Sequence, residues 1–103
     1  MNAIKAAMLI LIMSAITALA DGTITAPTLG GASKDVTDQL VRYASDQDRT
    51  AVLRLILSGS ATLLNSGQRV HLVETALFSG LVKVRIQGSI REWWIPIEHY
   101  QRD

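Results

Sequence analysis

The chain has 103 residues, a formal net charge of +1 and no cysteine. This length fits a single domain, and the balanced charge argues against a dedicated nucleic-acid binder, which usually carries a strong basic bias. The lack of cysteine excludes a disulfide scaffold, a zinc–thiolate site and a thiol nucleophile.

Residues 1–20 have the pattern of a secretory signal peptide. A short basic start ends at Lys5, residues 6–20 are apolar apart from one serine and one threonine, and the last three residues are Ala-Leu-Ala. This small-x-small pattern predicts cleavage between Ala20 and Asp21. The alternative is an uncleaved inner-membrane anchor, but spanning a bilayer takes roughly 20 apolar residues. We therefore expect a periplasmic or secreted protein that meets the membrane only through this segment before cleavage.

Two segments precede the expected core. Residues 21–34 contain glycines and a proline without a lasting period, which predicts a flexible linker. Residues 35–49 predict an amphipathic helix. Three apolar side chains recur at helical spacing and would share one face: Val36, Leu40 and Tyr43. We expect this face to pack on the rest of the domain or to dock on a partner.

The rest of the chain reads as short elements separated by turns. Thr50–Leu57 is a dense apolar run that fits a buried strand or the last turns of a helix continuing from residue 35. Its β-branched residues and the Ser-Gly-Ser break after it favour the strand, and the helix stays an alternative. Apolar and polar residues alternate in 69–74 and 81–86, and a third strand is expected at 92–95. In 81–86 the alternation predicts Val82, Val84 and Ile86 inward and Lys83 and Arg85 outward. Several short strands at close spacing are typical of a small barrel.

Three motifs in this region carry a family resemblance. Residues 64–70 (LNSGQRV) are similar to a turn in which a leucine precedes a glycine and a strand-opening valine, and 82–85 (VKVR) to a central strand. The closing pattern is a glycine turn, a tryptophan–aliphatic pair and an aromatic end: Gly88, Trp94-Ile95-Pro96 and His99-Tyr100. With these motifs, the chain from about Thr50 onward resembles the bacterial Src-homology-3-like (SH3-like) domain. The resemblance implies a mainly β (α+β) fold, with a five-stranded barrel over residues 50–103 preceded by one amphipathic helix.

Two adjacent tryptophans suggest a binding surface. Trp93 and Trp94 would face opposite sides of a strand, and the resemblance implies that Trp94 enters the core while Trp93 is exposed. Together with Phe78 and Tyr100, an exposed Trp93 would form a platform for a peptide or a sugar. The alternative is that the N-terminal helix covers this platform, so that Trp93 is part of the core.

Candidate catalytic groups are sparse. His71 and His99 could meet beside Glu74 or Glu98 to form a metal site or an acid–base pair, but nothing in their spacing indicates it. The nucleophile pattern GxSxG is absent from the sequence. We therefore expect no catalytic residues, no metal and no cofactor.

Three functional hypotheses remain. The first is an exported non-catalytic binding module of a bacterial envelope, which recognises a protein segment or a cell-wall component such as peptidoglycan. The second is a small structural or assembly subunit, or an inhibitor, of an envelope complex that docks through the Val36/Leu40/Tyr43 face. The third is an enzyme acting on cell-wall polymers, for which no set of catalytic groups is visible.

Overall fold

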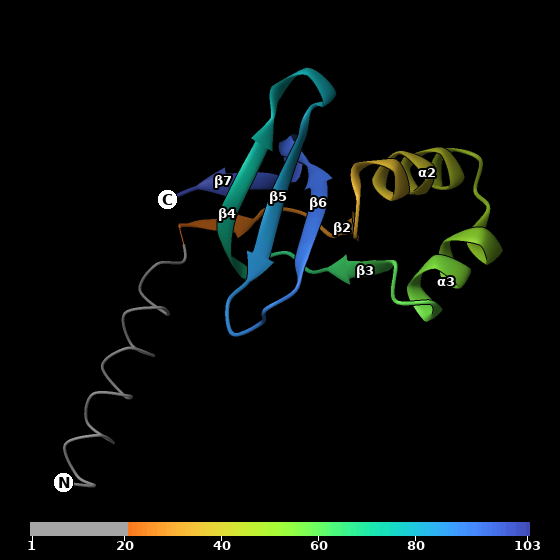
Figure 1. Ribbon diagram of the computed structural model, residues 1–103, viewed down its shortest axis with the longest axis horizontal. Helices are drawn as coiled ribbons and strands as arrows, with labels where there is room; N and C mark the ends of the chain where they lie inside the picture. The colour runs from red at the N-terminus through yellow and green to blue at the C-terminus, as the bar shows by residue number, and fades with distance from the viewer. Residues whose placement is uncertain (1–20) are drawn as a thin grey trace, which may run out of the picture.

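The computed structural model describes residues 21–103, so the predicted signal segment up to Ala20 lies outside the described residues. Over these described residues the fold is α+β and mainly β, with seven antiparallel strands and two α-helices (Figure 1). The strands are β1 (Gly22–Ile24), β2 (Thr28–Gly31), β3 (Ala61–Leu64), β4 (Arg69–Ala76), β5 (Leu81–Ile86), β6 (Glu92–Pro96) and β7 (Tyr100–Arg102). The helices are α2 (Lys34–Ser45) and α3 (Arg49–Leu57), and two 3₁₀ turns are η1 (Leu77–Ser79) and η2 (Ile97–His99). Within residues 21–103, no helix has the length and apolarity needed to cross a bilayer.

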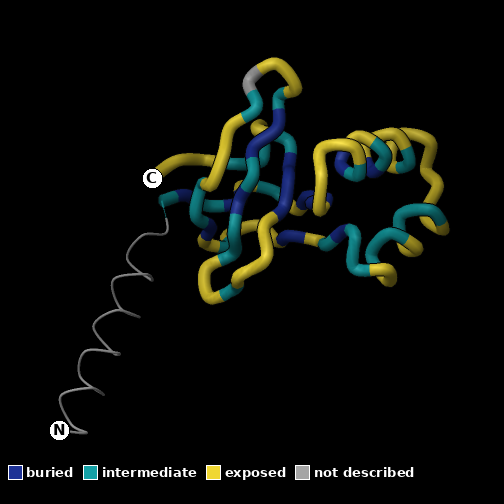
Figure 2. Tube along the Cα trace, viewed as in Figure 1, coloured by how far each residue is buried: buried dark blue, intermediate teal, exposed yellow. Residues whose placement is uncertain are grey.

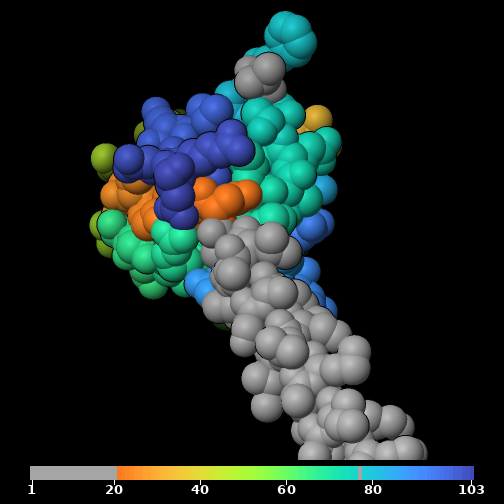
Figure 3. All heavy atoms as spheres, turned by 90° about the vertical axis from the view of Figure 1, so that its left-hand side faces the viewer, coloured from red at the N-terminus to blue at the C-terminus, as the bar shows by residue number. Residues whose placement is uncertain are grey.

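One bent segment connects the two halves of the sheet. The strand order is β3-β2-β6-β5-β4-β1-β7, and only residues 25–27 separate β1 from β2. The first half of this segment pairs with β4 and β7, and the second half pairs with β3 and β6. Figure 3 shows the first described residues lying beside the last strand of the chain. Segments at opposite ends of the sequence therefore share one sheet.

The prediction of a flexible linker over 21–34 is wrong, because this stretch contains β1, β2 and the start of α2. Its glycines mark close approaches between elements. A Cβ atom on Gly22 would lie 2.2 Å from Cε2 of Tyr100, and one on Gly31 would lie 2.4 Å from Oγ1 of Thr37. Glycine here makes room for a neighbouring side chain, and composition alone does not distinguish that use from flexibility.

The core lies on the inner face of the sheet, where the buried parts of the strands meet (Figure 2). Its fully buried members are Ile24, Leu64, Val70, Val82, Val84 and Ile95. The sequence alternation predicted that Val82 and Val84 point inward and Lys83 and Arg85 outward, and the burial pattern of β5 confirms it. Burying an aliphatic side chain of this size contributes about 1.5–3 kcal/mol.

Residues 50–57 form most of α3, so the favoured strand assignment is wrong. The side chain of Asp48 caps the helix, since its Oδ1 accepts a hydrogen bond from the Ala51 amide at 3.1 Å. The helix is not a continuation of α2 either, because Gln47 has a positive φ of 58° and interrupts the helical backbone. The predicted boundary at residue 50 therefore fails as well: α3 forms a helical hairpin with α2, inserted between β2 and β3 (Figure 1).

Candidate functional site

Helix α2 is fixed to the sheet by buried polar and apolar contacts. Ser33 caps its start by accepting a hydrogen bond from the Val36 amide at 3.2 Å. One turn later, the fully buried Thr37 places its Oγ1 3.0 Å from the carbonyl oxygen of Trp94 in β6. Leu40 is also buried, on the same side of α2. These contacts hold the helix beside β2 and β6, and they leave a groove along its next turn.

This groove, referred to below as the α2 groove, is bounded by α2 on one side and by β2, β3 and η2 on the other. Its lining is mostly aliphatic or proline, with polar groups toward η2: Pro27, Thr28, Leu29, Leu40, Val41, Ala44, Ser45, Leu63, Pro96, Glu98 and His99. Val41 is 50% exposed and Leu63 is 54% exposed. A site that leaves two large aliphatic side chains half in water is suited to an apolar ligand.

The polar end of the α2 groove is ordered by an imidazole. Nδ1 of His99 lies 2.7 Å from Oγ1 of Thr28, and its Nε2 lies 3.8 Å from Oε1 of Glu98. Thr28 is buried in β2, so its hydroxyl is positioned to orient the imidazole of His99 and is not available to solvent. The imidazole and the exposed Glu98 carboxylate can offer hydrogen bonds and charge to a ligand at this end.

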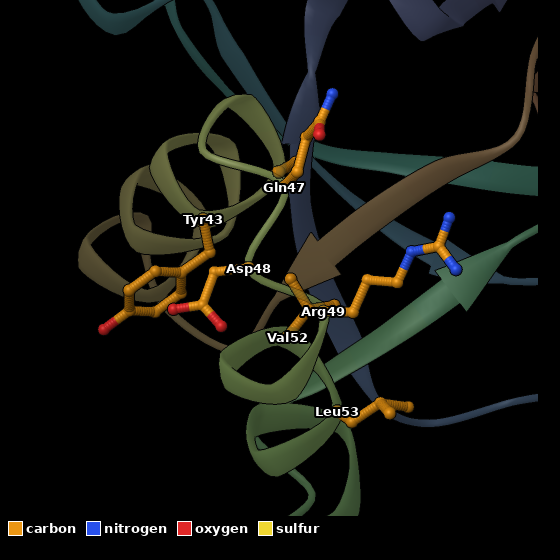
Figure 4. A pocket seen from close by; sticks show the side chains of 7 residues that line it. Tyr43, Gln47, Asp48, Arg49, Val52 and Leu53 are labelled. Atoms are coloured by element: carbon orange, nitrogen blue, oxygen red, sulfur yellow. The ribbon is translucent and has the colours of Figure 1, made fainter.

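A second pocket lies at the junction of the two helices (Figure 4). It is lined by Tyr43, Ala44, Gln47, Asp48, Arg49, Val52 and Leu53. Figure 4 shows Arg49 and Leu53 projecting from the same side of α3, away from Tyr43 on α2. The pocket therefore has one mixed basic and apolar wall and one aromatic wall.

The two tryptophans are placed differently from the prediction. In the β5–β6 register, Trp93 is opposite Val84 and lies on the inner face, whereas Trp94 is opposite Lys83 on the outer face. Trp93 is 5% exposed and Trp94 is 6% exposed. The outer face is not open to water, because α2 covers it and the Nζ atoms of Lys34 and Lys83 lie 5.4 and 5.3 Å from the Trp94 ring centroid. The expectation of an exposed Trp93 is therefore wrong, whereas Trp94 is buried as expected, although on the outer face under α2. The alternative of a buried Trp93 is confirmed.

The predicted aromatic platform does not form, because its members do not share an open surface. Trp93 is buried, and the Arg91 guanidinium stacks 4.3 Å from its ring centroid. Phe78 is fully exposed in η1 at the tip of the β4–β5 hairpin. The half-buried Tyr100 ring packs on Gly22, and its hydroxyl lies 3.3 Å from Oδ1 of Asp21. Burial and the nearby Asp21 charge raise the pKa of Tyr100 above its ordinary value.

The predicted docking face of α2 is turned mostly inward. Leu40 is buried, and Val36 and Tyr43 are partly buried, so only part of this face is available to a partner. Sequence reasoning missed Val41, because it lies one residue after the periodic stripe and reads as a solvent position. It also missed Leu63, since the edge position of β3 depends on pairing with β2. Residues 61–64 form a short, mostly apolar run in the sequence, which does not indicate that its third residue is exposed.

The histidines lie at separate sites. Nδ1 of His71 is 3.7 Å from Oδ2 of Asp21, whereas His99 contacts Thr28. Among residues 21–103, no group of three or more histidine, aspartate or glutamate side chains is arranged to hold a metal ion. Arg69 in β4 forms a two-point ion pair with the carboxylate of Asp103, which directly follows β7. This ion pair links the end of β7 to β4.

Comparison of the chain with family models, with curated proteins and with solved structures finds no match.

Proposed function

We propose that this protein is a non-catalytic binding module whose α2 groove holds an extended segment of another protein. The observation that carries the proposal is the pair of half-exposed aliphatic side chains, Val41 and Leu63, on opposite walls of one groove. The groove lining contains no phenylalanine, tyrosine or tryptophan side chain, and such rings are what a sugar-binding platform would offer. Aliphatic and proline walls with one polar end favour a peptide over a cell-wall glycan.

The contact energy of such a site is modest. Covering the remaining exposed half of Val41 and Leu63 would contribute about 1.5–3 kcal/mol in total, taking about 1.5–3 kcal/mol for each complete burial. Hydrogen bonds at the His99 end would add specificity. We expect a weak and reversible complex, of the kind formed by modules that recognise short segments.

We further propose that the sheet is an SH3-like barrel and that the protein acts in the bacterial envelope after export. The bent segment 22–31 pairs with β4 on one side and β6 on the other, which would close the β4–β5–β6 sheet on itself. A 3₁₀ turn between the last two strands, at η2, supports the same assignment. Export is supported by the pattern of residues 1–20, and mass spectrometry of the protein recovered from a bacterial envelope fraction tests it: an N-terminus at Asp21 is expected.

The groove is tested with a displayed library of unstructured peptides selected against the immobilised protein. Replacing Val41 or Leu63 by serine should weaken binding of the selected peptides by roughly fivefold each, about 1 kcal/mol. Ile90→Ser is the matched control, because Ile90 is an exposed aliphatic residue of the β5–β6 loop, outside the groove. Equal binding by all three variants, or selective binding of peptidoglycan fragments in place of peptides, would contradict the proposal.

A further inference from the structure

Helix α3 carries an exposed arginine–leucine stripe, made of Arg49, Leu53, Arg54 and Leu57. Leu53 is 56% exposed and Leu57 is 85% exposed, and α3 contributes no fully buried residue. Positions 49, 53 and 57 recur every four residues and share one face of the helix, with position 54 beside them. Short helices in proteins depend on tertiary packing of an apolar face. The two leucines of the stripe are therefore apolar surface that residues 21–103 leave largely uncovered.

The two arginines give this face a defined charge. Neither guanidinium group makes an ion pair within the described residues, and α3 itself contains no acidic side chain. Asp48, which precedes the helix, already accepts a hydrogen bond from the Ala51 amide as the cap. A complementary partner must therefore present carboxylates next to apolar side chains.

The pocket at the helix junction adjoins the stripe. Arg49 and Leu53 belong to both, and the opposite wall of the pocket is formed by Tyr43 and Gln47 of the preceding helix and turn (Figure 4). A concave site next to an exposed stripe can receive a projecting side chain. The pocket shares only Ala44 with the α2 groove, so a ligand here would not depend on Val41 or Leu63.

We propose that the arginine–leucine stripe docks an acidic amphipathic helix of another protein, with one apolar side chain entering the junction pocket. The charge distribution favours a protein over an anionic membrane. Residues 34–57 hold four basic side chains (Lys34, Arg42, Arg49, Arg54) and four acidic ones (Asp35, Asp38, Asp46, Asp48), so their net charge is zero. A flat anionic surface would meet both signs, whereas a helix can place its carboxylates over the arginines alone.

The test is a helix-constrained peptide library displayed on phage and selected against the full-length protein. The recovered peptides should carry apolar residues three or four apart, flanked by aspartate or glutamate. Arg54→Glu should weaken their binding by about tenfold or more, and Arg54→Gln by less. Leu57→Ser should weaken it as well. Arg102→Glu is the charge-matched control, because Arg102 is an exposed arginine on β7, and it should change binding by less than about twofold.

Circular dichroism establishes that each variant is folded, and Val41→Ser separates this site from the α2 groove because it should leave binding of the acidic helices unchanged. Failure to recover any helix, recovery of helices without acidic enrichment, or equal binding by Arg54→Glu would overturn the proposal. Two further results would also overturn it by assigning another occupant. One is Arg54-dependent binding to vesicles of phosphatidylglycerol and phosphatidylethanolamine, and the other is a dimer in sedimentation that Arg54→Glu dissociates.

Discussion

Replacing Thr37 by valine tests how α2 is attached to the sheet. The substitution keeps the shape of the side chain and removes only the hydroxyl, which lies 3.0 Å from the carbonyl oxygens of both Trp94 and Ser33. The single hydroxyl proton serves one of these acceptors at a time, so one hydrogen bond is lost. At a fully buried position this loss should cost about 1–2 kcal/mol of unfolding free energy.

For a domain of this size, that cost lowers the melting temperature by roughly 5–15 °C. Urea unfolding followed by tryptophan fluorescence measures it well, since both tryptophans are buried and Trp94 lies under α2. Thr37→Ser keeps the hydroxyl and removes only the methyl group. Its loss of stability should therefore be smaller than the loss in Thr37→Val and the cost of the missing methyl group added together. Thr50→Val, at an exposed position of α3, is the control and should change stability by less than about 0.5 kcal/mol.

A loss below about 0.5 kcal/mol for Thr37→Val would refute the reasoning, because it would mean that the buried hydroxyl contributes no more than a surface group. The same variant bears on function. If α2 is held by this contact, Thr37→Val should also weaken ligands of the α2 groove, while Ile90→Ser should not.

Three other outcomes are expected from the described contacts. Gly22→Ala should destabilise the protein by about 1–3 kcal/mol in thermal unfolding, because the new methyl group would overlap the Tyr100 ring. The hydrogen bond from Arg69 lowers the pKa of Asp103, so this pair stabilises the fold above the usual carboxyl pKa near 4 and loses its effect as the pH falls through the lowered value; unfolding curves of the wild type and Asp103→Asn should therefore converge in acid. Burial raises the pKa of Tyr100, so stability should fall as the pH rises above about 10, and Tyr100→Phe should reduce this alkaline loss.

The parts of the fold that sequence reasoning predicted are those specified by local signals. The alternation in 81–86 predicted the inward residues of β5, and helical spacing predicted α2 within a few residues. The glycines predicted to lie in turns do so. Gly67 and Gly88 have positive φ values of 88° and 86°, which residues with a Cβ atom rarely adopt.

Two of the errors, at the tryptophans and at residues 21–34, share a physical cause, because each concerned what covers a segment and not its own periodicity. Alternation places Trp93 and Trp94 on opposite faces, but it does not say that α2 and two lysine side chains cover the outer one. Likewise, the glycines of 21–34 read as flexible until Tyr100 and Thr37 are seen to occupy the space beside them. Sequence reasoning named three residues that line the α2 groove, Leu40, Glu98 and His99. It could not predict the exposure of Val41 and Leu63, because that exposure depends on the tertiary arrangement.

The pairing of β1 with β7 has a consequence for the order of folding. Gly22 pairs with Arg102 and Ile24 with Tyr100, so the first described strand needs the last one as its neighbour. Contacts between residues so distant in sequence form slowly, since a long loop must close before they contribute. Synthesis from the N-terminus therefore delivers β1 long before its partner β7 exists, and the sheet cannot be completed until β7 has been made.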